Sequence, residues 1–126
     1  MSLVFDAGAL IALERNDRDL WLALKRAASQ SRDVIVPSTV LAQVWRADAA
    51  RARLAKVLEH CVIAPFDGLA REVGALCGRA KTSDICDAHV ALVASRAAFV
   101  LYTSDDGDLR HLLRVIGRGN PQIVHC

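Results

Sequence analysis

Two aspartates stand where the chain leaves an apolar run. Asp6 follows the run 3–5 directly, and Asp105 comes shortly after the run 99–102. Each run has the character of a buried strand, and the carboxyl ends of such strands open onto the crevice where α/β sheets bind ligands. An aspartate there can also cap the helix that follows, and this alternative applies to Asp6.

A third acidic position lies inside an apolar helical segment. Asp87 is set among the small and aliphatic residues of the segment 85–95, where a carboxylate is costly unless it is paired or binds a metal ion. Asp84 shares its face but stands nearer the predicted helix start, so we expect Asp84 mainly to cap the helix. Asp106 and Asp108 extend the acidic group that begins at Asp105.

Carboxylates that converge without basic partners repel one another, and a divalent cation removes that repulsion. Oxygen ligands alone favour Mg²⁺ or Mn²⁺. Such an ion lowers the pKa of a bound water and stabilises the leaving oxygen of a phosphodiester. The acidic residues therefore predict a metal site for phosphoryl chemistry.

The elements that would position these acids form an alternating pattern. Short continuous apolar runs, typical of strands buried on both faces, are separated by segments with helical spacing. We therefore expect an α/β fold, in which residues 1–126 form a single domain with a parallel sheet of about five strands flanked by helices on both faces. In such a fold the first and fourth strands can be neighbours, which would bring Asp6 and Asp105 toward one crevice. The five runs are 3–5, 34–36, 62–63, 99–102 and 123–124.

Local signals refine the helices. Ser38 and Ser83 are predicted to cap helix starts, and a basic helix from about 47 to 60 is expected to present a solvated face that covers the core. His89 and His111 are expected to be structural or surface residues rather than ligands. The aromatic side chains are interpreted as core, namely Phe5, Trp21, Trp45, Phe66 and Phe99.

Composition excludes several classes of protein. The chain has 126 residues, 53% of them hydrophobic, and a formal net charge of +2, so no strong overall field attracts nucleic acid. Four cysteines form no C-x-x-C pair, which argues against zinc-ribbon and thioredoxin-like sites and favours reduced thiols. Without a signal-peptide pattern or a long apolar stretch, we expect a cytoplasmic protein with no membrane association.

Four segments together resemble a known family: 4–11, 36–46, 82–89 and 103–105. In this order and spacing they are similar to PIN-domain ribonucleases of the VapC toxin type. The resemblance implies a Mg²⁺- or Mn²⁺-dependent endoribonuclease that acts on structured RNA, forms a homodimer and is inhibited by a small antitoxin protein. It implies that Asp6, Asp87 and Asp105 bind the metal ion, with Asp108 as an accessory catalytic acid.

One position departs from the family pattern. Gln43 stands where the family usually has a glutamate, and an amide supplies neither negative charge nor a base. The alternative function is therefore a catalytically weakened PIN-fold module that binds RNA or protein.

Single positions in the sequence exclude two other classes of protein. A haloacid-dehalogenase-like phosphatase needs an acid where Gly8 stands, and a receiver domain needs a lysine in the terminal run 121–126.

Overall fold

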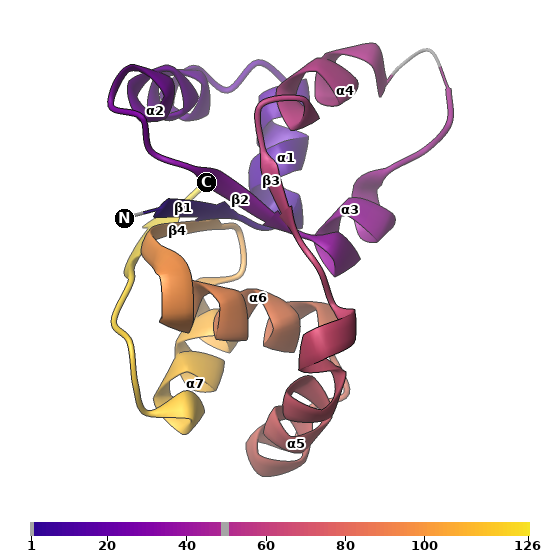
Figure 1. Ribbon diagram of the computed structural model, residues 1–126, viewed down its shortest axis with the longest axis vertical. Helices are drawn as coiled ribbons and strands as arrows, with labels where there is room; N and C mark the ends of the chain where they lie inside the picture. Colours follow the sequence, from indigo (N-terminus) through magenta and orange to yellow (C-terminus); the bar gives the residue numbers. More distant parts are fainter. Residues whose placement is uncertain (1, 49–50) are drawn as a thin grey trace.

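A computed structural model describes residues 2–48 and 51–126 of the chain (Figure 1). Its centre is a five-stranded sheet in which every pairing is parallel. The α/β fold predicted from the apolar runs is therefore confirmed. In spatial order the strands are β3 (Val62–Ala64), β2 (Val34–Pro37), β1 (Ser2–Phe5), β4 (Ala98–Thr103) and β5 (Gln122–His125).

Helices cover both faces of the sheet, as expected. Figure 1 shows α1, α2 and α4 on one side and α5, α6 and α7 on the other. None of the helices in the described ranges is both long enough and apolar enough to cross a membrane. The helices are α1 (Ala7–Glu14), α2 (Arg18–Ser29), α3 (Ser38–Val44), α4 (Ala52–Leu58), α5 (Ala70–Ala80), α6 (Ile85–Ala97) and α7 (Asp106–Ile116), with a 3₁₀ turn η2 at Asp67–Leu69.

The strand order reverses direction between β1 and β4. From β1 the chain first builds outward through β2 and β3, and later returns to add β4 and β5 on the other side. Val4 pairs with Leu101 and Phe5 with Tyr102, so the first and fourth strands are neighbours, an arrangement that the expected fold permits. Their carboxyl ends form the topological switch point, where open α/β sheets usually bind ligands.

The two outer strands differ from the prediction. The expectation that all five runs are buried on both faces is wrong for β3, where Val62 is 48% exposed, and for β5, which is only partly buried. An edge strand has a neighbour on one side only, and the helices do not fully cover it. The central strands β1 and β2 are buried, and they carry much of the core.

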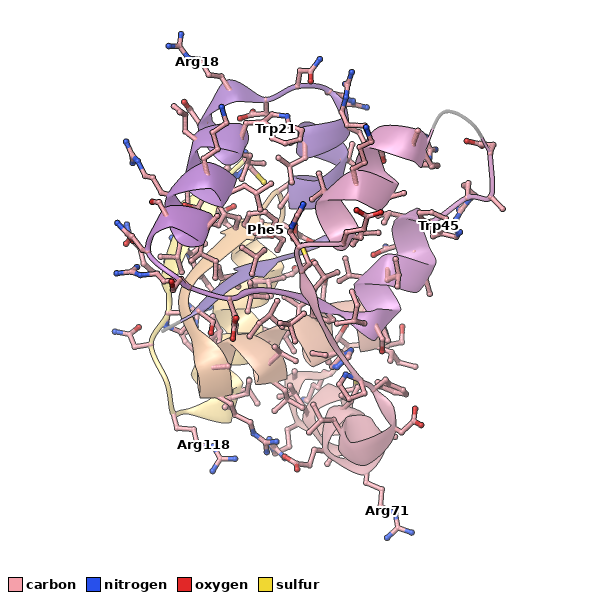
Figure 2. All side chains as sticks on the ribbon, turned by 45° about the horizontal axis from the view of Figure 1, so that its top comes forward. Phe5, Arg18, Trp21, Trp45, Arg71 and Arg118 are labelled. Carbon is pink, nitrogen blue, oxygen red and sulfur yellow. The ribbon has the colours of Figure 1, made fainter. Side chains whose placement is uncertain are left out.

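The aromatic residues interpreted as core differ in their burial. Phe5 is fully buried, and Trp21 and Phe66 are partly buried against the core. The interpretation of Trp45 as core is wrong, because α3 ends there in extended backbone and leaves the indole 40% exposed (Figure 2). The side chain of Phe99 lies outside the described part of the structure.

The predicted helix from 47 to 60 is shorter than expected. Only 52–58 is α-helical, and part of the predicted span, residues 49–50, lies outside the described ranges. Its basic side chains do more than face solvent. Arg51 forms an ion pair of 3.0 Å with Glu14, and Arg53 donates to the main-chain oxygen of the same residue, so both hold α4 against α1.

Candidate metal centre

Asp6 joins the end of β1 to the start of α1. Its Oδ1 accepts a hydrogen bond of 3.0 Å from the main-chain N–H of Ala9, and its own N–H donates to the Tyr102 oxygen on β4. The capping role considered from the sequence is therefore present. The carboxylate is only 5% exposed and also accepts from the Thr103 hydroxyl, so capping does not account for all of its surroundings.

Three other carboxylates converge at the same edge of the sheet. One oxygen each from Asp87, Asp105 and Asp108 lies within 4.8 Å of the other two. Asp87 comes from the first turn of α6, whereas Asp105 and Asp108 flank the start of α7 and are three residues apart on one helix face. We call these three residues the acidic cluster. Asp6 lies outside this group but close enough for its charge to act on Asp87.

The buried Thr103 fixes the backbone of Asp105 at the end of β4. Its Oγ1 accepts a hydrogen bond of 2.8 Å from the Asp105 N–H, and Thr103 itself is fully buried. Asp105 is the residue before α7, yet its side chain makes no capping bond to that helix. Thr103 thus contacts the two acids at the ends of β1 and β4. The sequence prediction missed this role, although a threonine at the end of an apolar run was a visible signal.

Burial and mutual repulsion raise the pKa values of these acids. Desolvation, followed by the charges of Asp84, Asp105 and Asp6, raises the pKa of Asp87 to about 7. Desolvation also raises the pKa of Asp6, against the opposing hydrogen bonds from Thr103 and Ala9. For Asp105 the pKa is raised by desolvation and by the neighbouring Asp108. The charges that act most strongly on Asp87 are all negative, and a divalent cation is the chemical species that would relieve them.

The other nearby acids have different roles. Asp84 Oδ1 accepts a hydrogen bond of 2.9 Å from the Asp87 N–H, so Asp84 caps α6 as predicted. The prediction that Ser83 caps this helix is wrong, since the cap lies one residue later. Ser38 is also not a cap, because α3 starts at Ser38 itself after Pro37 and has no side-chain capping bond within the described residues. Asp106 binds His125 at 2.7 Å.

Gln43, on α3, contacts α6. Its Oε1 accepts a hydrogen bond of 3.1 Å from the Cys86 thiol, one residue before Asp87. Burial raises the pKa of Cys86 to about 11, so this thiol keeps its proton at neutral pH and can donate it. One turn earlier on α3, Thr39 forms a 2.8 Å hydrogen bond with Nδ1 of His89. These two contacts fix α3 against α6.

The two histidines considered from the sequence have structural surroundings. His89 is fully buried, and its ring packs edge-on against Phe66. His111 is exposed, with Nε2 3.0 Å from the main-chain oxygen of Ala80. Neither belongs to the acidic cluster.

Gly8 allows the first turn of α1 to approach the turn after β4 closely. A Cβ atom at this position would lie 2.1 Å from Ser104 Oγ and 2.6 Å from Ser104 Cβ. Only glycine fits this approach without moving the turn that carries Asp105.

Comparison with models of known families and with curated proteins finds no match for this chain. The metal centre is therefore inferred from its geometry and from the sequence patterns described above.

Proposed function

We propose that this protein is a Mg²⁺- or Mn²⁺-dependent endoribonuclease that hydrolyses phosphodiester bonds of structured RNA. The observation that carries the proposal is the convergence of Asp87, Asp105 and Asp108, with oxygens within 4.8 Å of one another at the switch point of the sheet. Hard oxygen ligands of this kind suit Mg²⁺ and Mn²⁺.

The residues have distinct roles in this proposal. Asp87 and Asp105 hold the ion, and Asp108 completes the group from the first turn of α7. Asp6 is held in place by Ala9 and contributes negative charge from the end of β1. When bound, the ion would lower the pKa of an attacking water and stabilise the leaving oxygen.

The RNA substrate and the protein partners are inferred from the resemblance to VapC-type toxins rather than from the geometry. In this proposal the protein is the toxin of a toxin–antitoxin pair, acts in the cytoplasm, forms a homodimer and is inhibited by a small antitoxin. Light scattering of the purified protein tests the homodimer directly. A monomer mass at tens of micromolar would contradict it.

A second candidate function is favoured by Gln43. Because this side chain is an amide and bonds to Cys86, it adds no charge to the acidic cluster. If the metal site is too weak to support cleavage, the protein would act as a PIN-fold module that binds RNA or protein without cleaving it.

Cleavage of total RNA distinguishes the two candidates. The purified protein, free of antitoxin, is incubated with total RNA with and without Mg²⁺ or Mn²⁺, and new 5′ ends are mapped. An endoribonuclease produces discrete new ends only with metal, whereas a binding module produces none. Absence of metal-dependent ends at all protein concentrations would contradict the enzymatic proposal.

Two variants connect the cleavage to the site. Asp6→Asn and Asp87→Asn are expected to abolish cleavage while the protein remains folded, because each removes a negative charge and Asn still caps α1 at position 6. Asp33→Asn, at an exposed position before β2, is the matched control and should cleave as the unsubstituted protein does. Full cleavage by Asp87→Asn would show that the acidic cluster is not the active site.

A further inference from the structure

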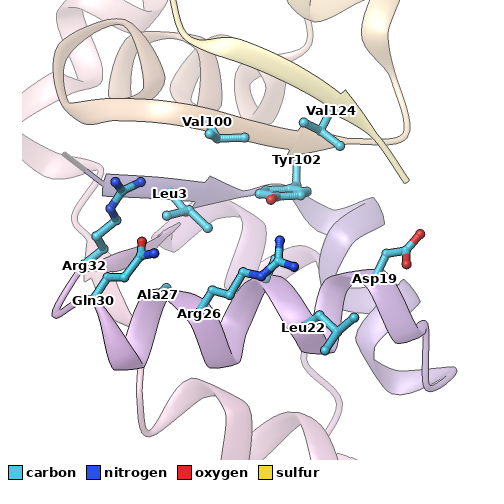
Figure 3. A pocket seen from close by; sticks show the side chains of 11 residues that line it. Leu3, Asp19, Leu22, Arg26, Ala27, Gln30, Arg32, Val100, Tyr102 and Val124 are labelled. Carbon is cyan, nitrogen blue, oxygen red and sulfur yellow. The ribbon is translucent and has the colours of Figure 1, made fainter.

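A pocket lies on the face of the sheet opposite α6, between α2 and strands β1, β4 and β5 (Figure 3). Its cavity volume is about 360 Å³, within the range of sites for small ligands, which is about 300–1,000 Å³. The acidic cluster does not contribute to its lining. Tyr102 lines the pocket from β4, and the next residue, Thr103, contacts Asp6 and Asp105.

One wall of this pocket is apolar and includes an aromatic ring. Leu3 and Val100 are paired in register on β1 and β4, and Tyr102 is paired with Val124 on β5. The Tyr102 ring is fixed by an edge-on contact with Phe5, with ring centroids 5.3 Å apart and an interplanar angle of 77°. This wall is suited to the face of a flat aromatic group such as a nucleobase.

The opposite wall carries positive charge and hydrogen-bond donors. Arg26, Gln30 and Arg32 line it from α2 and the residues that follow. In Figure 3 the guanidinium of Arg26 points from α2 toward the strands, on the side where Tyr102 lies. The two arginines outnumber the single acidic residue of the lining, Asp19.

Arg26 is placed to interact with a ligand rather than with another side chain. It forms no ion pair with any carboxylate in the described ranges, and Asp19 lies about two helical turns away. Its charge reaches Tyr102, where it partly offsets the burial that raises the pKa of the phenol. A basic residue in the last turn of a helix also interacts favourably with the negative end of the helix dipole. That role alone does not require the side chain to face the sheet.

We infer that this pocket binds a nucleoside monophosphate, with the phosphate held by Arg26 and the base lying against Tyr102. Guanidinium groups are the preferred partners of phosphate because their planar donors match its oxygens. Gln30 adds an amide that can pair with a base or a sugar hydroxyl. The site is separate from the acidic cluster and does not depend on the proposed nuclease activity.

Calorimetric titration of the full chain in the presence of a metal chelator tests this inference. Adenosine monophosphate and uridine monophosphate are compared with adenosine and with inorganic phosphate. We expect at least one monophosphate to bind more tightly than either fragment, because only the nucleotide reaches both walls. No binding of either monophosphate at millimolar concentration would overturn the inference, and so would equal affinity for inorganic phosphate.

Three variants locate the binding. Arg26→Gln should weaken nucleotide affinity about tenfold or more, the loss expected for one charge-assisted hydrogen bond. Arg18→Gln is the matched control, because Arg18 lies on the same helix, points into solvent in Figure 2 and does not line the pocket. Asp87→Asn should bind nucleotide normally even though it abolishes cleavage. Unchanged affinity in Arg26→Gln, or an equal loss in Arg18→Gln, would overturn the assignment.

Discussion

The Cys86 thiol donates a hydrogen bond of 3.1 Å to the side-chain oxygen of Gln43, and this contact joins α3 to α6 immediately before Asp87. The position at which the resemblance leads one to expect a glutamate therefore faces the helix that carries an acid of the cluster. An added negative charge at residue 43 would lie on the same side of the molecule as Asp87.

Gln43→Glu is expected to tighten Mn²⁺ and Mg²⁺ binding, because a charged oxygen beside a hard-cation site raises its affinity. Cleavage should rise at low metal concentration if the ion limits the rate. Calorimetric titration of metal into both proteins, together with cleavage at several metal concentrations, measures the two effects. If neither changes, Gln43 does not contribute to the metal centre.

Asp87→Asn is expected to stabilise the metal-free protein at high pH. Folding raises the pKa of Asp87 from 3.8 to about 7, so the folded state binds more protons than the unfolded state between these values. Stability from this group is therefore greatest at low pH and falls as the pH rises through about 7. Because Asp87 is partly solvated, we expect a gain of only about 1–2 kcal/mol at pH 8.

Urea unfolding of Asp87→Asn at pH 5 and pH 8, in chelator, checks this pH dependence. Asp33→Asn is again the control, since that residue is exposed and lies away from the acidic cluster. A gain at pH 5 as large as at pH 8 would contradict the proposed origin of the effect.

Metal ions are expected to stabilise the protein more at pH 8 than at pH 5.5. Below its raised pKa, Asp87 holds a proton that a cation must displace, so metal binding weakens as the pH falls. Thermal unfolding with and without Mn²⁺ at the two pH values measures the difference. The stabilisation should disappear in Asp87→Asn, and its persistence there would place the ion elsewhere.

Thr39→Val is expected to destabilise the protein by about 1–3 kcal/mol, because it leaves a nitrogen of the buried His89 without its hydrogen-bond partner. Ser38→Ala, at the neighbouring position without a capping bond, should cost less than about 0.5 kcal/mol. Chemical denaturation of both variants provides the comparison. Equal losses would show that the Thr39–His89 bond contributes nothing.

Gly8→Ala is expected to destabilise the protein by about 1–3 kcal/mol and to weaken metal binding, because the added methyl group would collide with Ser104 next to Asp105. Gly74→Ala is the matched control. That glycine lies inside α5 with open space around its Cβ position, so alanine should stabilise the helix by about 0.5–1 kcal/mol. Thermal unfolding of the two variants should therefore shift in opposite directions.

The sequence by itself determined the type and order of the elements. The apolar runs around residues 3–5 and 99–102 are short and continuous, and a run of that kind forms a strand largely through its own composition, whereas its burial depends on its place in the sheet. Asp6 and Asp105 could be placed at strand ends for the same reason, because a strand end is a local property. That β1 and β4 lie side by side was only one of the arrangements open to such a sheet, and the strand order itself is a tertiary feature.

Only the tertiary structure decided the distances between the acidic side chains and the exposure of individual residues. Whether Asp108 meets Asp87 depends on how α7 packs beside α6, and no local spacing contains that information. Trp45 is as apolar as a core residue, yet it is exposed because the chain leaves α3 at that point. The pKa of Asp87 likewise depends on charges from three separate parts of the chain, which come together only when the sheet and its helices have assembled.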